Sequence, residues 1–373
     1  MATATATKER KTMGITLDTS TLRAALAAVM RAVPARSAKP ILQNVRLGDG
    51  LLSGTDLEVR IDREIDYHDE PMLLPFSRLK AIVGECGTAE LTLTVNGSSC
   101  IVKAGRSEWR LPVGDASEFP VWNREGESKP LVRIPCDQFA RAAWSVCGAV
   151  DRKGGRYACS AVLVEVAGDE CWTVATDGRR LYACKIEHDQ AVDEASVLIP
   201  AGAVELIAEV AGKFPEAAVQ FYASGSDIVA DIDVAVISVR LAAGEFPKWR
   251  KLIPKATNDT TAITRTLLES ATRAAAIVAS ESSRGVRYTF GGETLLVEGK
   301  SSEAGESTVR CAVVSSGSEC RVMLNPGYVV DWLRELPLDA EPTVDVEAKD
   351  GESAVVLRCG DHLAVVMPLS EDA

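Results

Sequence analysis

The sequence predicts an α+β protein built from three similar domains, each with two helices packed on antiparallel sheets. Three observations support this fold class. The chain has 373 residues, enough for two or three domains. An apolar helical stripe recurs three times, and so does a proline that follows an apolar strand and opens a helix. A threefold repeat of one unit therefore organises the chain.

The first helix of each unit is predicted from apolar residues in a 4,3,4 spacing, which is typical of an amphipathic helix. The first stripe recurs after offsets of 117 and 128 residues. The three stripes are Leu22, Leu26, Val29 and Val33; Phe139, Ala143, Val146 and Val150; and Leu267, Ala271, Ala274 and Val278.

The second helix of each unit is predicted to open at Pro75, Pro200 or Pro326, which lie 125 and 126 residues apart. Proline suits the first helical position because its missing N–H would be unpaired there in any case. Apolar residues follow four and seven positions later, as expected for a buried helix face. They are Leu79 and Ile82, Val204 and Ile207, and Val330 and Leu333.

Strands are predicted between these helices from alternating apolar and polar residues. The patterns cover residues 161–166, 171–175, 229–242 and 354–359, and turns are expected at 48–50 and 96–97. We expect a flexible extension at 1–12, followed by domains at 13–130, 131–254 and 255–373.

The charge balance excludes a globally basic surface for nucleic acid, because 41 Lys and Arg face 53 Asp and Glu, for a net charge of -12. A basic patch would have to be local. The sequence has no apolar run long enough to span a membrane, and its start lacks the apolar segment of a secretory signal. We therefore expect a cytoplasmic protein.

Catalytic and metal-binding patterns are lacking in the sequence. The three histidines stand apart from any partner at motif spacing, and the ten cysteines include no C-x-x-C pair. Nucleotide-binding and hydrolase motifs are also missing. We expect no catalytic residues, no metal and no cofactor. The alternative from the enzyme class is a cysteine nucleophile at Cys147 or Cys159.

Five motifs occur in order along the chain. They are KPIL at 39–42 with GTDLE at 54–58, ATDGRRL at 175–181, GEFPKWR at 244–250, RGVR at 284–287, and VVMPL at 365–369. With these motifs the chain resembles the bacterial β sliding clamps, the processivity subunits of DNA polymerase III. The resemblance extends from residue 13 to about residue 369.

The resemblance implies a non-catalytic DNA sliding clamp. Two subunits would assemble head to tail into a homodimer, a closed ring of six domains with helices lining the hole. The ring would encircle double-stranded DNA without reading its sequence. It would tether the replicative polymerase and bind the clamp loader and repair proteins through short peptide motifs, without membrane contact. The alternative is a diverged clamp-like interaction protein with a different set of partners.

The resemblance also assigns three groups of residues. Those near DNA would be Arg36, Arg152, Lys153, Arg156 and Tyr157. The dimer interface would join Trp109 and Leu111 to Ile277 and Val278 of the partner. The partner-peptide pocket would comprise Cys159, Thr176, Gly178, Arg179, Arg180, Leu181, Pro247, Lys251, Leu252, Val365, Val366, Met367, Pro368 and Leu369.

The chain departs from the family pattern inside this pocket. Cys159 stands where the family has a larger aliphatic residue, and Arg179 where histidine is common. Residues 370–373, SEDA, replace an ending in arginine and an aliphatic residue, and Glu371 and Asp372 are expected to place negative charge near the pocket mouth. These changes are expected to affect partner affinity rather than the fold.

Overall fold

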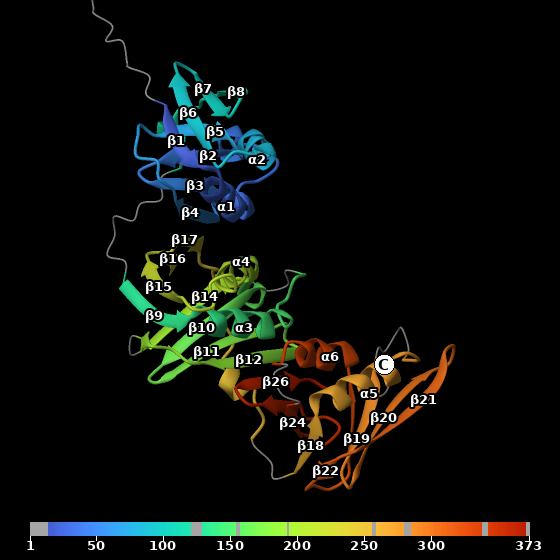
Figure 1. The fold of residues 1–373 in the computed structure, drawn as a ribbon. Coiled ribbons are helices and arrows are strands. Elements are labelled where there is room, and N and C mark those ends of the chain that lie inside the picture. Colours follow the sequence, from blue (N-terminus) through green and yellow to red (C-terminus); the bar gives the residue numbers. More distant parts are fainter. Residues whose placement is uncertain are drawn as a thin grey trace, which may run out of the picture. The chain divides into compact units, whose positions relative to one another are not determined.

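The computed structural model describes residues 14–120, 129–153, 157–191, 194–255, 259–279, 285–337 and 342–370 (Figure 1). The chain forms two compact units. One combines residues 1–129 with 222–240, and the other combines residues 130–221 with 241–373. Within the described ranges, no helix has the length and apolar character needed to cross a membrane. The predicted extension at 1–12 lies outside the described residues.

Among its described residues, the first unit contains two α-helices and most of two antiparallel sheets. Its elements are β1 (Ile15–Asp18), α1 (Thr19–Val29), β2 (Asn44–Gly48), β3 (Leu51–Thr55), β4 (Val59–Glu64), β5 (Met72–Pro75), α2 (Phe76–Glu85), β6 (Glu90–Asn96), β7 (Ser99–Ala104), β8 (Ser107–Pro112), β16 (Asp227–Ile232) and β17 (Ala235–Arg240).

In the part of the second unit that the structure describes, there are four α-helices. Its elements are β9 (Lys129–Pro135), α3 (Cys136–Cys147), β10 (Ala161–Ala167), β11 (Glu170–Thr176), β12 (Arg180–Ile186), β13 (Gln190–Ala191), β14 (Glu194–Pro200), α4 (Ala201–Ala211), β18 (Thr260–Thr264), α5 (Arg265–Ala276), β19 (Val286–Phe290), β20 (Thr294–Ser301), β21 (Gly305–Ala312), β22 (Val314–Ser315), β23 (Cys320–Leu324), α6 (Pro326–Arg334), β24 (Thr343–Glu347), β25 (Val355–Cys359) and β26 (His362–Val366). Strand β15 (Ala218–Ser224) spans the point where the chain passes between the units.

The sheets repeat one topology. In the first unit the strand order is β17-β4-β3-β2-β5, and in the second it is β26-β12-β11-β10-β14. The second sheet continues from β26 through β25, β24, β18 and β22, so strands from the central and C-terminal parts of the sequence form one sheet. Four-stranded sheets also occur, with orders β1-β6-β7-β8 and β21-β20-β19-β23. The predicted fold class of helices on antiparallel sheets is confirmed.

The apolar stripes of the first helices are confirmed for α1 and α3 and wrong for α5. In α5 the buried residues are Leu268, Ala271, Thr272 and Ala275, whereas Leu267 is 36% exposed. The stripe is thus shifted by one position toward the C-terminus. The shift arises because Thr272 occupies a core position, where its hydroxyl lies 3.0 Å from the hydroxyl of Tyr288. A pattern of apolar residues alone omits such a polar core residue.

The second helices begin near the predicted prolines, and their predicted apolar residues are buried. Pro326 is the first residue of α6, as expected. Pro75 and Pro200 instead precede α2 and α4 as N-cap residues with extended or non-helical backbone.

The predicted strand at 229–242 is two strands. A turn after Ile232, where Asp233 has φ 37°, separates β16 from β17. The alternating pattern continues through this tight hairpin, because the two strands resume the same alternation after only two residues. The predicted turns at 48–50 and 96–97 are confirmed by positive φ at Asp49, Gly50 and Gly97.

Arginines hold the ends of two helices within their own domains. Arg23 of α1 donates to the carbonyls of Val83 and Cys86, at 2.9 and 3.0 Å, where α2 ends. Arg265 of α5 donates to the carbonyl of Leu333 at the end of α6. The last carbonyls of a helix lack intrahelical partners, so these bonds stabilise both helix pairs.

Candidate functional site

The predicted pocket residues meet where β12 pairs with β26. Arg180 lies opposite Val366, and Leu181 lies opposite Val365. The chain continues past β26 with a bond from Met367 N to Arg179 O (2.9 Å). A further bond, from Leu369 N to Met323 O (2.8 Å), holds the C-terminal segment beside β23. Residues almost 200 positions apart in the sequence therefore form one site.

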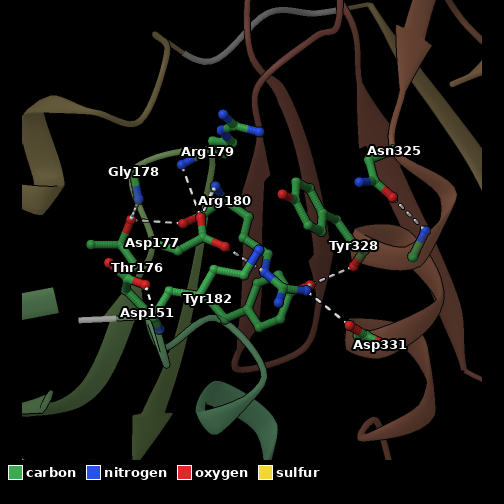
Figure 2. Close-up of polar contacts among 12 residues, drawn as sticks. Asp151, Thr176, Asp177, Gly178, Arg179, Arg180, Tyr182, Asn325, Tyr328 and Asp331 are labelled. Atoms are coloured by element: carbon green, nitrogen blue, oxygen red, sulfur yellow. Dashed lines mark hydrogen bonds and ion pairs between the residues drawn. The ribbon is translucent and has the colours of Figure 1, made fainter. Parts of the chain in front are cut away.

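A tight turn at residues 176–180 shapes one edge of the site (Figure 2). The hydroxyl of Thr176 donates to the carbonyl of Arg180 at 2.7 Å and accepts from the N–H of Gly178 at 3.1 Å. One carboxylate oxygen of Asp177 accepts from the N–H groups of Arg179 and Arg180. Gly178 has φ 84°, a conformation that glycine adopts without strain. Side-chain hydrogen bonds within the turn therefore help to fix its shape.

Arg180 links the central strands to α6 (Figure 2). Its guanidinium lies 2.9 Å from Asp331 Oδ2, and its Nε lies 3.1 Å from Asp177 Oδ2. It also lies over the ring of Tyr328, 4.3 Å from the centroid. Its side chain is 13% exposed and the side chain of Asp331 is 48% exposed, so only one end of this network is open to solvent.

Tyr182 also belongs to this network, because Arg180 donates to its hydroxyl at 3.2 Å. Its hydroxyl donates to the carbonyl of Tyr328, and burial raises the pKa of this phenol well above its usual value. Sequence reasoning missed Tyr182, Tyr328 and Asp331. The one available signal was the spacing of Tyr328 and Asp331, three residues apart on one face of a predicted helix.

The apolar part of the site consists of buried residues on the opposite sheet face. Leu181 and Val365 are 3% and 4% exposed and pack in a cluster with Trp249. Two apolar side chains remain at the rim: Leu252 is 50% exposed and Met367 is 47% exposed. Exposed apolar groups beside a buried apolar floor suit a ligand with apolar anchors.

Hollows extend the site on two sides. Cys159 lines one of about 580 Å³ with Ala158 and residues 243–248, which include Pro247. Pro368 and Leu369 line another of about 940 Å³ with Met323 and residues 350–352. Thr176 and Val366 are buried, Arg179 and Lys251 are exposed, and Cys159 is 6% exposed. The structure thus gathers the predicted pocket residues around one seam, although no single hollow contains them all.

The predicted DNA-contacting residues differ in what the structure shows. Arg36 and Lys153 are exposed. Arg152 forms an ion pair with Glu205 of α4, a partner that sequence reasoning missed. Arg156 lies outside the described residues, and only the backbone of Tyr157 is described, at the start of a 3₁₀ turn.

The predicted interface residues occupy edge elements. Trp109 and Leu111 lie on β8, the last strand of its four-stranded sheet. Trp109 is half-buried, and Leu111 is only 6% exposed, so Leu111 packs mainly within its own domain. Ile277, directly after α5, is 80% exposed, and Val278 is half-buried. Ile277 and Trp109 therefore offer the most apolar surface.

Burial argues against a nucleophilic role for Cys147. All ten cysteines are buried. Burial raises the pKa of the Cys147 thiol to about 12, whereas a nucleophilic thiol needs a lowered pKa. No cluster of metal-ligating side chains occurs among the residues that the structure describes.

Comparison with known sequence families matches nearly the whole chain. The N-terminal, central and C-terminal domains of the DNA polymerase III beta subunit match residues 13–123, 133–248 and 250–369. The beta sliding clamp of Escherichia coli K12 is 28% identical over 375 residues, covering 96% of this chain and all of that protein. That of Vibrio cholerae is 27% identical, with the same coverage.

Solved structures share the fold. A DNA polymerase sliding clamp from Pseudomonas aeruginosa, crystallised with a ligand, superposes with a TM-score of 0.88 at 25% identity. The sliding clamp from Bacillus subtilis also gives a TM-score of 0.88, at 20% identity. Each comparison covers 96% of this chain and all of the other.

Proposed function

Because the chain belongs to the DNA polymerase III β subunit family, we propose that it is a DNA sliding clamp, a ring-shaped homodimer that encircles duplex DNA. It tethers the replicative polymerase and serves as a platform for the clamp loader and repair proteins. The observation that supports this proposal most strongly is that the N-terminal, central and C-terminal domains of the family match successive parts of the chain in the same order. The proposed role is non-catalytic, and because a bacterial chromosome is replicated in the cytoplasm, we propose that the protein acts there.

The net charge of -12 is consistent with this role. A closed ring stays on DNA by topology, so it does not need the many phosphate contacts that bind tightly and depend on salt. An acidic body also disfavours DNA binding outside the ring. We assign the DNA contacts to Arg36, Arg152, Lys153, Arg156 and Tyr157. The ion pair of Arg152 with Glu205 keeps one of these contacts weak.

We assign partner binding to the seam of β12 and β26. Short peptides with apolar anchors would bury them near Leu181 and Val365, between Pro247 and Met367. The network of Arg180 supports this pocket, because it holds the turn at 176–180 against α6. The remaining pocket residues keep the roles that the family resemblance gives them.

We assign dimerisation to the edges of the domains at 13–130 and 255–373. Trp109 and Leu111 of one subunit would meet Ile277 and Val278 of the other. Ile277 is 80% exposed, and an apolar side chain so exposed gains most from a partner. Replacing both Ile277 and Val278 by alanine is expected to shift the mass in light scattering from dimer toward the 39.8 kDa monomer.

Retention on DNA tests the function. The protein is loaded onto nicked circular duplex by the cognate clamp loader with ATP, and the DNA is then linearised. We expect retention on the circle and rapid loss from the linear ends. Direct binding to a short duplex is expected to be weak and to fade with salt. Equal retention on circular and linear DNA would contradict the ring.

A further inference from the structure

The first unit contains a second copy of the turn that frames the peptide site. Residues 55–59 precede their counterparts at 176–180 by 121 positions. The hydroxyl of Thr55 donates to the carbonyl of Val59 at 2.9 Å and accepts from the N–H of Leu57 at 3.0 Å. Asp56 Oδ1 accepts from the N–H groups of Glu58 and Val59. These bonds match those of Thr176 and Asp177 one for one.

The backbone of the two turns agrees as well. Leu57 has φ 83° where Gly178 has φ 84°. Leucine is disfavoured in this left-handed region, so the surrounding bonds impose the conformation. The first turn thus keeps the pocket's shape although its residue does not favour it.

The strands beside the two turns also correspond. β4 pairs with β17 as β12 pairs with β26, so Arg60 lies opposite Ser238 where Leu181 lies opposite Val365. The chain leaves β17 with a bond from Arg240 N to Glu58 O (3.0 Å), the counterpart of the bond from Met367 N to Arg179 O. The sequence Glu-Phe-Pro at 118–120 recurs at 245–247, which supplies Pro247 to the pocket.

The two copies differ in the floor. In the central domain the floor residues are apolar and belong to one buried cluster: Val174, Leu181, Ala183 and Val365. Their counterparts in the first unit are Ser53, Arg60, Asp62 and Ser238, all of which are buried. Four apolar positions in one copy are therefore polar in the other.

Arg60 fills the floor of the first copy. Its Nε lies 2.8 and 3.0 Å from the two carboxylate oxygens of Asp62. Its terminal nitrogens lie 3.3 Å from Ser53 Oγ and 3.3 Å from the carbonyl of Pro120, the counterpart of Pro247. Arg60 is 9% exposed and Asp62 is 3% exposed. The guanidinium thus links the floor residues Ser53 and Asp62 to the backbone at Pro120.

We propose that the junction of β4 and β17 is a second copy of the partner-peptide site and that the Arg60–Asp62 ion pair closes it. The inference rests on the proposed function of the β12–β26 seam. An apolar anchor entering the first copy would have to break the buried Arg60–Asp62 ion pair, which is strongly unfavourable in a site shielded from water. Each subunit therefore binds one partner peptide, and the ring binds two rather than four.

Calorimetric stoichiometry tests the proposal. The probe is a synthetic peptide with the short clamp-binding motif of the cognate polymerase subunit, titrated into the full-length dimer. The opened variant carries the central-domain residues, as Ser53→Val, Arg60→Leu, Asp62→Ala and Ser238→Val. The matched closed variant carries the reverse exchanges, as Val174→Ser, Leu181→Arg, Ala183→Asp and Val365→Ser. Dimer mass and thermal unfolding control for folding.

We expect one peptide per subunit for the wild type, two for the opened variant and at least a tenfold loss of affinity for the closed variant. Binding of two peptides per wild-type subunit would contradict the proposal that the Arg60–Asp62 ion pair closes the second copy. Binding of only one peptide per subunit by an opened variant that is still dimeric would contradict it as well. No binding by the wild type would instead refute the proposed function of the β12–β26 seam. If the fourfold opened variant does not fold, Arg60→Met with Asp62→Leu preserves the volume and gives the same test.

Discussion

The Arg180–Asp331 ion pair is expected to stabilise the junction between the central strands and α6 measurably. The double-mutant cycle combines Arg180→Met with Asp331→Ala. At 2.9 Å, Coulomb's law gives about 1.4 kcal/mol in bulk water and about 6 kcal/mol at an effective dielectric constant of about 20. Arg180 is 13% exposed, which places the pair between these limits, and Asp177 shares its guanidinium. We therefore expect a coupling free energy of about 2 kcal/mol.

The assay is urea unfolding followed by tryptophan fluorescence, with the free energy of unfolding compared among wild type, both single variants and the double variant. The matched control is the pair Arg141–Asp137, at a similar 2.7 Å but 50% and 42% exposed. Its coupling is expected to stay below about 0.5 kcal/mol. If the Arg180–Asp331 coupling is no larger than the control's, burial does not strengthen the pair and the junction argument is wrong.

Three further outcomes are expected. Gly178→Ala is expected to lower the free energy of unfolding by about 1 kcal/mol in urea titration, because alanine is disfavoured at φ 84°, although the added Cβ would meet no atom within 4 Å beyond the adjacent residues. An unchanged unfolding midpoint would contradict this. Deleting residues 367–373 is expected to abolish peptide binding in fluorescence anisotropy, whereas deleting 371–373, outside the described residues, is expected to change it little; equal binding by both dimeric truncations would refute the pocket. Burial lowers the pKa of His362, Arg141 lowers it further, and Asp361 opposes the shift, so the unfolded chain binds this proton more readily than the folded protein. The free energy of unfolding is therefore expected to fall as pH drops through about 6.5. His362→Gln is expected to flatten that part of the plot of stability against pH, and an unaltered slope would show that His362 does not cause it.

Periodicity predicted the fold well because most of the helices bury apolar stripes. It failed at α5, since Thr272 reaches the core through a hydrogen bond that no hydropathy pattern encodes. It also merged β16 and β17, whose alternation continues through a hairpin. The spacing of apolar residues predicts which face of a helix or strand is buried. It does not predict a polar side chain that is buried together with its hydrogen-bond partner.

The candidate site was predictable only in its short motifs. The turn at 176–180 follows from Thr-Asp-Gly, whose side chains bond within the turn. Pairing of β12 with β26 joins segments almost 200 residues apart, and sequence spacing carries no information on such a contact. Asp331, Tyr328 and Glu205 were missed for the same reason, since each acts on a residue far away in the chain. The first copy of the turn was visible in the sequence as Thr-Asp at 55–56, but its closure depends on the contacts of Arg60.

The arginines that hold the helix ends bear on how fast a clamp diffuses along the duplex. A protein moving on DNA must exchange phosphate contacts at each step, and every cation in contact adds friction. Arg23, which is exposed, and Arg265 direct guanidinium N–H groups to backbone carbonyls, so fewer of their donors are left for phosphate. Arg265, Arg273 and Arg334 all lie within 4 Å of Glu269, whose single negative charge offsets one of their three positive charges. A count of basic residues on the helices therefore overestimates the phosphate contacts that would slow the ring.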